Sequence, residues 1–421
     1  MNTPHEDTVV ARFFAPAKAA LTAAKSKREC KSYPDHDFIF GGIGRVIAVV
    51  QSGRDWVQRL QAQMNSGVTV ATFFQALGST RRHRLTQEVA THVRDQVDQD
   101  CDASNDPLAE HPELDGFEVY ASDGHYQAAA THTKPVEGKI QAQGSFFSLN
   151  LRSHSLSLLD IGRPKNKKEH DMSALKRLTP AELRLGAKAK TKVIHVYDRA
   201  GIDYHQWFKW KTKGIYFISR EKANSRPLVI GEIPIEDDPR NTGVLSDERI
   251  GVFAGVMIRR IRYQDPASGE IFSFITNEFT LPPGLIAFLY KLRWDVEKSF
   301  DEKKNKLQEN KAWATSDEAK SQQAHFVCMA HNLLVLLERK LEREEGLRDD
   351  KLYKKRLKRM EQIEKKIRAA DRTPNPMVLK CNRITQRSLQ FIRWLRNAIE
   401  SLTSWCDGVA QLRPLMAKYL S

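Results

Sequence analysis

The hydrophobic pattern of this chain changes twice along its length, and the two changes constrain its fold more than any other feature. Residues 43–64 and 68–97 carry apolar side chains at helical spacing. Strand-like runs then follow at residues 117–122, 144–151 and 155–161. Beyond Pro282 the helical spacing returns. We therefore expect an α/β fold, with a mixed sheet between helical N- and C-terminal regions.

The middle of the chain alternates between strand and helix signals. Thr179-Pro-Ala-Glu has a capping residue, a first-turn proline and a glutamate in capping-box position, so a helix should begin there. Residues 193–197 and 215–219 predict strands on either side of a helix at 204–213. Residues 227–280 are again rich in strand and turn signals, which indicates a β insertion.

These patterns divide the chain into five parts. We expect a helical N-terminal domain, the first part of an α/β core, a β insertion, a core helix and a helical C-terminal domain, at residues 1–110, 111–226, 227–280, 281–315 and 316–421. Residues 68–85 predict a helix, a turn and a basic helix, which suits insertion into a DNA groove. A solvated turn between two helices explains them equally well. The charged residues 334–369 predict either a solvated helical hairpin or a dimerisation arm.

The overall charge favours a polyanionic partner. The chain has 67 Lys and Arg against 52 Asp and Glu, a net charge of +15. Nucleic acid is the commonest such partner, although charge alone does not exclude an anionic membrane surface. No apolar run is long enough to span a membrane, and no signal region follows the N-terminus, so we expect a cytoplasmic protein. Five scattered cysteines without a Cys-x-x-Cys pair argue against structural zinc and a disulfide framework.

Two aspartates follow predicted strands of the sheet. Asp123 comes directly after residues 117–122, and Asp198 directly after residues 193–197. Either one alone is more often a turn or cap residue, and Asp123-Gly124 is an ordinary turn dipeptide. Together they are more informative, because the strand ends of α/β sheets commonly carry the reacting side chains.

The helix that opens at Pro283 carries four polar residues along one edge. Tyr290, Arg293, Glu297 and Lys304 are three, four and seven residues apart, which places them within about 60° around a helix. An apolar stripe lies beside them, formed by Leu285, Phe288, Leu292, Val296, Phe300 and Leu307. The alternative is a solvated face on which Arg293 and Glu297 form an ion pair.

Three carboxylates suit phosphodiester chemistry that depends on Mg²⁺, a cation that prefers oxygen ligands. Two such ions can activate a water or a 3′-hydroxyl and stabilise the leaving oxygen. Arg293 and Lys304 would then hold backbone phosphates, and Tyr290 would bond a phosphate or stack on a base.

The spacing Tyr-x2-Arg-x3-Glu-x6-Lys resembles the YREK signature of DDE transposases of the insertion-sequence-four family. Leu289-Tyr-Lys-Leu-Arg-Trp-Asp-Val-Glu-Lys-Ser-Phe is similar to the glutamate helix of that family. Tyr120-Ala-Ser-Asp-Gly resembles its first aspartate strand, and Val196-Tyr-Asp-Arg-Ala-Gly its second. The resemblance covers residues 117–306 well. His125 departs from it, because a small hydroxyl residue is expected there, and the role of His125 stays open.

The resemblance implies a ribonuclease H-like core and cut-and-paste transposition, often through a hairpin intermediate. Asp123, Asp198 and Glu297 would be catalytic and would bind two Mg²⁺ ions, with Mn²⁺ as a substitute. Tyr290, Arg293 and Lys304 would bind DNA. The implied partners are double-stranded DNA with terminal inverted repeats, target DNA and a second copy of the chain in the end complex. The implied location is the cytoplasm of a prokaryotic cell, at the nucleoid when DNA is bound.

Two other functions compete with transposition. A transposase-derived repressor would bind DNA without cleaving it, but three converging carboxylates without metal would repel phosphate. Another ribonuclease H-like nuclease, such as a junction resolvase, would keep the metal site. The long helical regions and the β insertion fit end recognition better than resolution of branched DNA.

Overall fold

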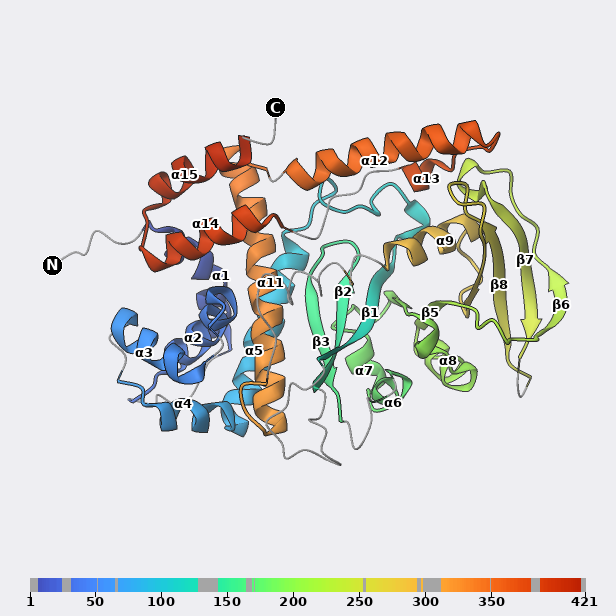
Figure 1. The fold of residues 1–421 in the computed structure, drawn as a ribbon. Helices are drawn as coiled ribbons and strands as arrows, with labels where there is room; N and C mark the ends of the chain where they lie inside the picture. Colours follow the sequence, from blue (N-terminus) through green and yellow to red (C-terminus); the bar gives the residue numbers. More distant parts are fainter. Residues whose placement is uncertain are drawn as a thin grey trace, which may run out of the picture.

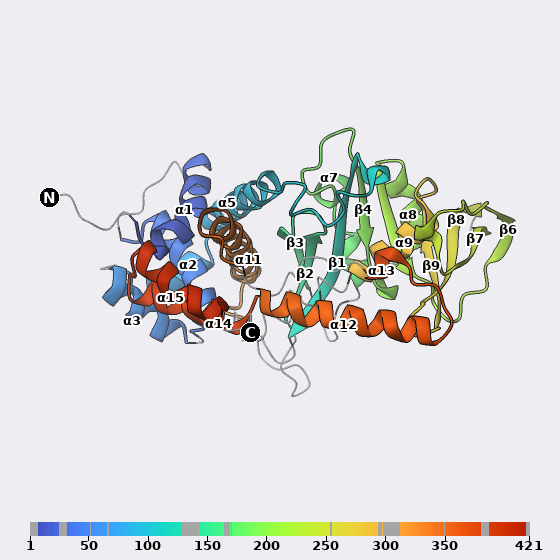
Figure 2. The same cartoon turned by 90° about the horizontal axis from the view of Figure 1, so that it is seen from above.

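The chain forms two lobes that lie side by side (Figures 1 and 2). The computed structural model describes residues 7–24, 32–50, 52–64, 67–127, 143–163, 169, 171–252, 255–293, 297, 312–348, 350–379 and 387–417. One lobe is helical, and the other is built on a sheet. The expected α/β class is confirmed at this level.

The helical lobe combines helices from both ends of the chain. Its helices are α1 (Val9–Ala23), α2 (Asp35–Ala48), α3 (Gly53–Met64), α4 (Val70–Leu77), α5 (Thr80–Gln99), α11 (Asp317–Glu345), α14 (Leu389–Glu400) and α15 (Trp405–Ala417). One apolar cluster joins them, with Phe13 of α1, Phe326 of α11 and Leu395 of α14 among its buried members. Helix α11 runs along the side of this lobe that faces the sheet, and it contacts β3 (Figure 1). Burial of its apolar face therefore depends on segments more than 300 residues apart in the sequence.

The apolar spacing over residues 43–64 does not produce one continuous helix. Helix α2 ends at Ala48 and α3 begins at Gly53. Val49 between them has a left-handed backbone, with φ of 65°. This conformation ends α2 and is unfavourable for a β-branched residue. Gly78 separates α4 from α5, as the glycine in the predicted turn indicates.

The second lobe contains one mixed sheet. Its strands are β1 (Phe117–Gln127), β2 (Gln143–Asn150), β3 (Leu156–Ile161), β4 (Lys192–Val196), β5 (Ile215–Arg220), β6 (Leu228–Glu232), β7 (Val244–Gly251), β8 (Met257–Gln264) and β9 (Ile271–Thr276). Their order across the sheet is β3-β2-β1-β4-β5-β9-β8-β7-β6. Strands β1, β4 and β5 are parallel, and the remaining neighbours are antiparallel. The strands of residues 227–280 thus belong to the same sheet as β1.

Short helices connect the strands and cover the sheet. They are η1 (Pro112–Leu114), α6 (Asp171–Leu175), α7 (Pro180–Leu183), η2 (Arg199–Gly201), α8 (Tyr204–Lys211), η3 (Pro239–Asn241) and α9 (Pro283–Leu292). The capping box at Thr179 and Glu182 is confirmed, because each side chain accepts from the other's backbone N–H. Trp207 of α8 is fully buried and stacks on Phe217 of β5, which fixes α8 against the sheet.

Strand β1 continues beyond the predicted end at residue 122. Strand β4 pairs with β1 only from Phe117 to Ala121, whereas β2 pairs with it as far as Gln127. The antiparallel partner β2 keeps the backbone of β1 extended after the parallel partner has ended. Asp123-Gly124 is therefore not a turn, and Asp123 lies within the strand, just past the end of β4.

Helix α9 is held closely against η3. A Cβ at Gly284 would lie 1.9 Å from the carbonyl oxygen of Arg240. The backbone N–H of Gly284 donates to Asn241 Oδ1 at 3.0 Å. Only glycine permits this approach at the start of the helix. The predicted start at Pro283 is confirmed, and Leu292 and Glu297 are helical in the described part of the predicted run to residue 307.

The charged C-terminal region does not form a hairpin. Helix α11 ends at Gly346, which has a left-handed backbone with φ of 62°. Helix α12 (Asp350–Ala369) then runs from the helical lobe across the sheet lobe towards β8 (Figures 1 and 2). It leads into the short helix α13 (Pro376–Leu379), which lies against η3. Among the described residues, no helix has the length and apolar character needed to span a membrane.

Candidate active site

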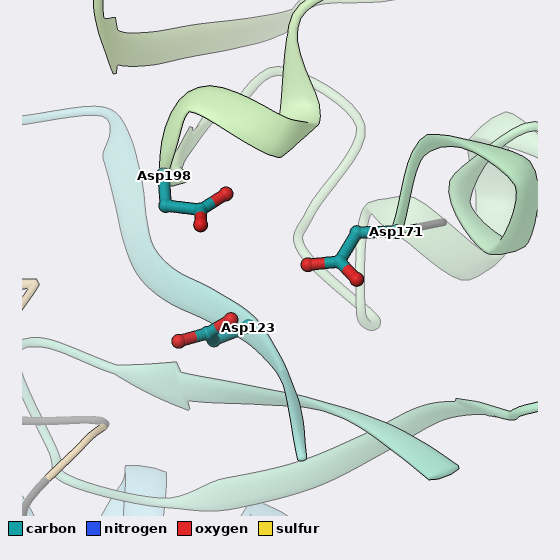
Figure 3. Close-up of side chains that lie close together, drawn as sticks. All are labelled: Asp123, Asp171 and Asp198. Atoms are coloured by element: carbon teal, nitrogen blue, oxygen red, sulfur yellow. The ribbon is translucent and has the colours of Figure 1, made fainter. Parts of the chain in front are cut away.

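Three aspartate side chains converge at the edge of the sheet. Carboxylate oxygens of Asp123, Asp171 and Asp198 all lie within 4.8 Å of one another. Figure 3 shows the three carboxylates directed towards a common space from β1, from the start of α6 and from the start of η2. The structure thus brings Asp123 and Asp198 together, as two neighbouring parallel strands allow, and adds Asp171.

Asp123 is positioned by a buried hydrogen-bond network beneath it. The ring of His195 on β4 is fully buried, and its Nε2 lies 2.8 Å from the carbonyl oxygen of Leu183. Nε2 must therefore carry the proton, which leaves Nδ1 to accept from the hydroxyl of Ser122 at 3.1 Å. Burial lowers the pKa of His195 to about 4, so the ring stays neutral. This network fixes the residue directly before Asp123.

Asp198 is positioned by the turn that follows it. Its Oδ1 accepts from the N–H of Ala200 at 2.8 Å and so caps η2. Its carbonyl oxygen accepts from the hydroxyl of Ser219 at 2.8 Å, which ties the end of β4 to β5. One carboxylate oxygen is used by the turn, and Asp198 remains partly exposed.

Asp171 was not among the residues singled out from the sequence. It follows the basic segment of residues 163–170 and is the first residue of α6. An acidic residue in the first turn of a helix is common for electrostatic reasons alone. Nothing local distinguishes Asp171 from such a residue, and only the packing of α6 brings it to the other two aspartates.

The carboxyl group of Asp123 is electrostatically strained. Burial raises its pKa to about 7, with the carboxylate of Asp198 as the next cause and Asp171 adding to it. The guanidinium of Arg293 opposes this rise. Like charges gathered in a partly buried space favour the neutral acid unless a cation compensates them. The site is therefore one in which a bound cation would gain strong interactions.

Glu297 is connected to this cluster through Arg293. The Arg293 guanidinium lies 2.8 Å from Glu297 Oε1 and 3.5 Å from Asp123 Oδ2. Arg293 itself is buried, with 6% of its surface exposed. Its pKa lies above the ordinary value, because burial lowers it but the charges of Tyr290, Glu297 and Asp123 raise it more. Arg293, at the end of α9, thus faces the aspartates and not solvent. The ion pair between Arg293 and Glu297 that a solvated face would also form is present.

A cavity of about 580 Å³ opens beside the cluster. Asp198 and Arg293 lie on its wall, whereas Asp123 and Asp171 do not. Its other walls carry aromatic rings and charges of both signs, from Tyr263, Phe272, Phe274, Phe288 and Tyr290, from Arg199, Arg220 and Lys291, and from Asp265 and Glu270. Tyr290 packs against Phe274, with 4.9 Å between the ring centroids. Asn375, Met377 and Val378 near α13 complete the cavity, so a distant C-terminal segment contributes to it.

Lys304 lies outside the described residues. His125 is two residues beyond Asp123 in β1 and so lies on the same face of the strand. It is not a member of the group of acidic side chains within 4.8 Å, as far as the described residues show.

The basic start of α5 is directed into the helical lobe. Arg81 donates to both carboxylate oxygens of Asp35, at 2.6 and 2.7 Å. Arg82 is buried, with its Nε 3.4 Å from Asp35. These two arginines therefore hold α5 to α2, while Arg84 is exposed. Neither interpretation of residues 68–85 includes this structural role of Arg81 and Arg82, which only the structure shows.

Comparison with known proteins adds one family. Residues 149–333 match the family model described as "Transposase DDE domain". The match contains Asp171, Asp198 and Glu297, begins after Asp123, and supports a DDE transposase. No curated protein matches the chain. Among solved structures, the "Cryo-EM structure of piggyBac transposase synaptic complex with hairpin DNA (SNHP)" is similar at 12% identity and a TM-score of 0.34, over 96% of this chain and 78% of that chain. A likeness this weak carries no argument.

Proposed function

We propose that this protein is a DNA transposase that cleaves transposon ends and joins them to target DNA in a cut-and-paste reaction. The observation that carries the proposal is the convergence of Asp123 and Asp198, with Glu297 linked to them by Arg293, in a chain that matches a transposase domain. The strand order β3-β2-β1-β4-β5 supports a ribonuclease H-like core. The YREK spacing of the sequence supports the insertion-sequence-four family.

The donor atoms of the site fit divalent cations. Carboxylate oxygens close to one another are the ligands that Mg²⁺ and Mn²⁺ prefer, and the strained Asp123 is the kind of group that a cation stabilises. We propose that Asp123, Asp198 and Glu297 hold two such ions. When bound, these ions would activate the attacking water or 3′-hydroxyl and stabilise the leaving oxygen.

The residues around the carboxylates suit a DNA end. Arg293 is fixed between Asp123 and Glu297, so it can neutralise a phosphate beside the reacting bond. Tyr290 lies at the wall of the cavity and packs on Phe274, so its ring or hydroxyl would contact a base or a phosphate that enters there. Lys304 would add a second phosphate contact from the same helix.

The partners follow from this reaction. We propose double-stranded DNA with terminal inverted repeats and a target duplex as substrates, with a homodimer pairing two ends. A hairpin on the transposon end is the proposed intermediate. Such a chain would act in the cytoplasm of a prokaryotic cell, at the nucleoid.

Cleavage of end DNA tests the proposal. The full chain is incubated with DNA that carries the terminal inverted repeats of its element, in Mg²⁺ or Mn²⁺, beside Glu297→Gln. This variant keeps the size of the side chain and removes its charge. We expect nicking and end release by the wild type and none by the variant. Specific binding without cleavage by either protein would contradict the proposal and indicate a repressor. Cleavage of branched DNA irrespective of sequence would indicate a junction resolvase.

A further inference from the structure

The structure assigns a further metal-binding residue to the candidate active site: we propose that Asp171 is a ligand of the divalent cation, together with Asp123 and Asp198. This inference rests on the proposed function, because it concerns the cation that the same site would hold. Its carboxylate is directed at the space between the other two, and the three groups lie within 4.8 Å of one another (Figure 3).

Apolar packing, and not the charge of the site, determines where Asp171 lies. Met172 and Leu175 on α6 are buried in a core cluster that also contains Tyr197, the residue before Asp198. Helix α6 packs against η2, the turn that begins directly after Asp198. The fold therefore keeps Asp171 beside Asp198, with only 9% of its surface exposed. Gathering three buried or half-buried carboxylates is unfavourable, and a divalent cation between them would offset that cost.

Gly124 supplies independent evidence, because it leaves space for the Asp171 carboxylate. A Cβ at Gly124 would lie 3.0 Å from Asp171 Oδ1 and 2.9 Å from the ring of Phe146. Gly124 is not among the glycines with positive φ, so its backbone conformation would accept other residues. The limit on a larger residue at Gly124 therefore comes from the Phe146 ring and the Asp171 carboxylate. The residue next to Asp123 thus allows a carboxylate from another element to reach the site.

The role of Asp171 differs from that of Glu297. The Glu297 carboxylate is paired with Arg293 and is not a member of the aspartate group among the described residues. Three aspartates can therefore offer oxygen ligands to one of the two cations of the proposed site. Oxygen ligands from three separate elements suit the geometry of Mg²⁺ or Mn²⁺.

Binding of Mn²⁺ to the full chain without DNA tests the inference. The signal of free Mn²⁺ in electron paramagnetic resonance gives the dissociation constant directly. We expect Asp171→Asn, which removes one charge at constant size, to weaken binding about 10-fold or more. Gly124→Ala should also weaken binding, although it leaves every carboxylate in place. Asp237→Asn is the matched control, because Asp237 is an exposed carboxylate far along the chain, and its loss should leave binding unchanged.

The variants separate failure of this inference from failure of the proposed function. If Asp123→Asn and Asp198→Asn lose Mn²⁺ while Asp171→Asn and Gly124→Ala bind like the wild type, Asp171 is not a ligand and the metal-dependent function stands. If none of the substitutions changes binding, the site does not hold the cation and the proposed function falls with it. Circular dichroism checks that each variant is folded. Should Asp171→Asn fail to fold, Gly124→Ala decides the question.

Discussion

At the scale of single residues, the site combines groups whose charges oppose one another. Asp123 lies between the carboxylate of Asp198, which raises its pKa, and the guanidinium of Arg293, which lowers it. Burial and the Asp198 carboxylate together outweigh the Arg293 guanidinium. In the metal-free protein the carboxyl group of Asp123 therefore holds a proton near neutral pH. Binding of a divalent cation would release this proton.

The raised pKa of Asp123 makes the stability of the metal-free protein dependent on pH. Its carboxyl has a pKa of about 7 when folded, against an ordinary value of 3.8, so the folded state binds the proton more tightly. Stability is therefore lost as the pH rises from about 4 to 7. Asp123→Asn cannot ionise, and its stability relative to the wild type should increase by on the order of 2 kcal/mol between pH 5 and pH 8. Urea unfolding in a chelating buffer measures the free energy of unfolding of both proteins at each pH. A stability difference between Asp123→Asn and the wild type that does not change with pH would contradict the prediction.

Arg293 should contribute one charge to DNA binding. We expect Arg293→Ala to weaken binding to end DNA and to reduce the slope of log K against log salt by about 1. The substitution also removes the buried guanidinium that pairs with Asp123 and Glu297. The two carboxylates would then repel the phosphates of DNA. Arg293→Lys keeps the charge and should keep most of the slope. Titration of labelled DNA at several salt concentrations distinguishes these cases, and an unchanged slope in Arg293→Ala would mean that Arg293 does not meet phosphate.

At the scale of elements, buried ion pairs set the position of α9 and hence of its polar edge. Arg259 of β8 is 2% exposed and pairs with Asp247 of β7 at 2.5 Å. Its Nη1 also donates to the carbonyl oxygen of Leu281 at 2.7 Å, just before α9. Glu278 accepts from the N–H groups of Thr280 and Leu281 and closes the same turn. The strands of residues 228–276 thus carry the charges that fix the start of this helix.

Loss of Arg259 should be costly because it leaves Asp247 buried without its partner. We expect Arg259→Met to lower the free energy of unfolding by about 3–5 kcal/mol. The double variant Arg259→Met with Asp247→Leu removes both charges and should recover much of this loss. Chemical denaturation of the two variants measures the effect. If the double variant is no more stable than Arg259→Met, the lost stability comes from the ion pair itself and not from the unpaired carboxylate of Asp247.

At the scale of the whole molecule, the two ends of the chain form one structure. The N–H of Val9 donates to the carbonyl oxygen of Thr403, and that of Trp405 to the carbonyl oxygen of Asp7. Helix α11 contributes to this helical core and also, through Ala324 and Cys328, to the core of the sheet lobe. The two lobes are therefore coupled by a shared helix.

Perturbing the last helix should loosen the first. A Cβ at Gly408 in α15 would lie 2.4 Å from Cγ2 of Val9 in α1. Gly408→Ala should therefore cost about 1–3 kcal/mol and increase amide hydrogen exchange in α1, some 400 residues away. Cys406→Ala is the control on the exposed side of α15. Exchange in α1 that is equal in both variants would contradict the coupling.

Local chemistry determined much of this protein. Apolar periodicity and capping residues predict most helices and strands, because these signals act between residues a few positions apart. The spacing of Arg293 and Glu297 likewise predicts their ion pair, and the places of Asp123 and Asp198 after two predicted strands indicate the edge of the sheet on which they lie. Each of these conclusions needs only the geometry of one element, whereas the pairing of β1 with β4 that brings the two aspartates together is a tertiary contact.

Tertiary structure alone decided the rest. The continuation of β1 past Asp123 depends on its partner β2, and the reach of α13 to the cavity depends on the path of α12 across the molecule. The same holds for Asp171, whose place beside Asp123 and Asp198 follows from the burial of α6 and the space at Gly124. The physical reason is common to all three: contacts between distant segments leave no periodic signal in either segment.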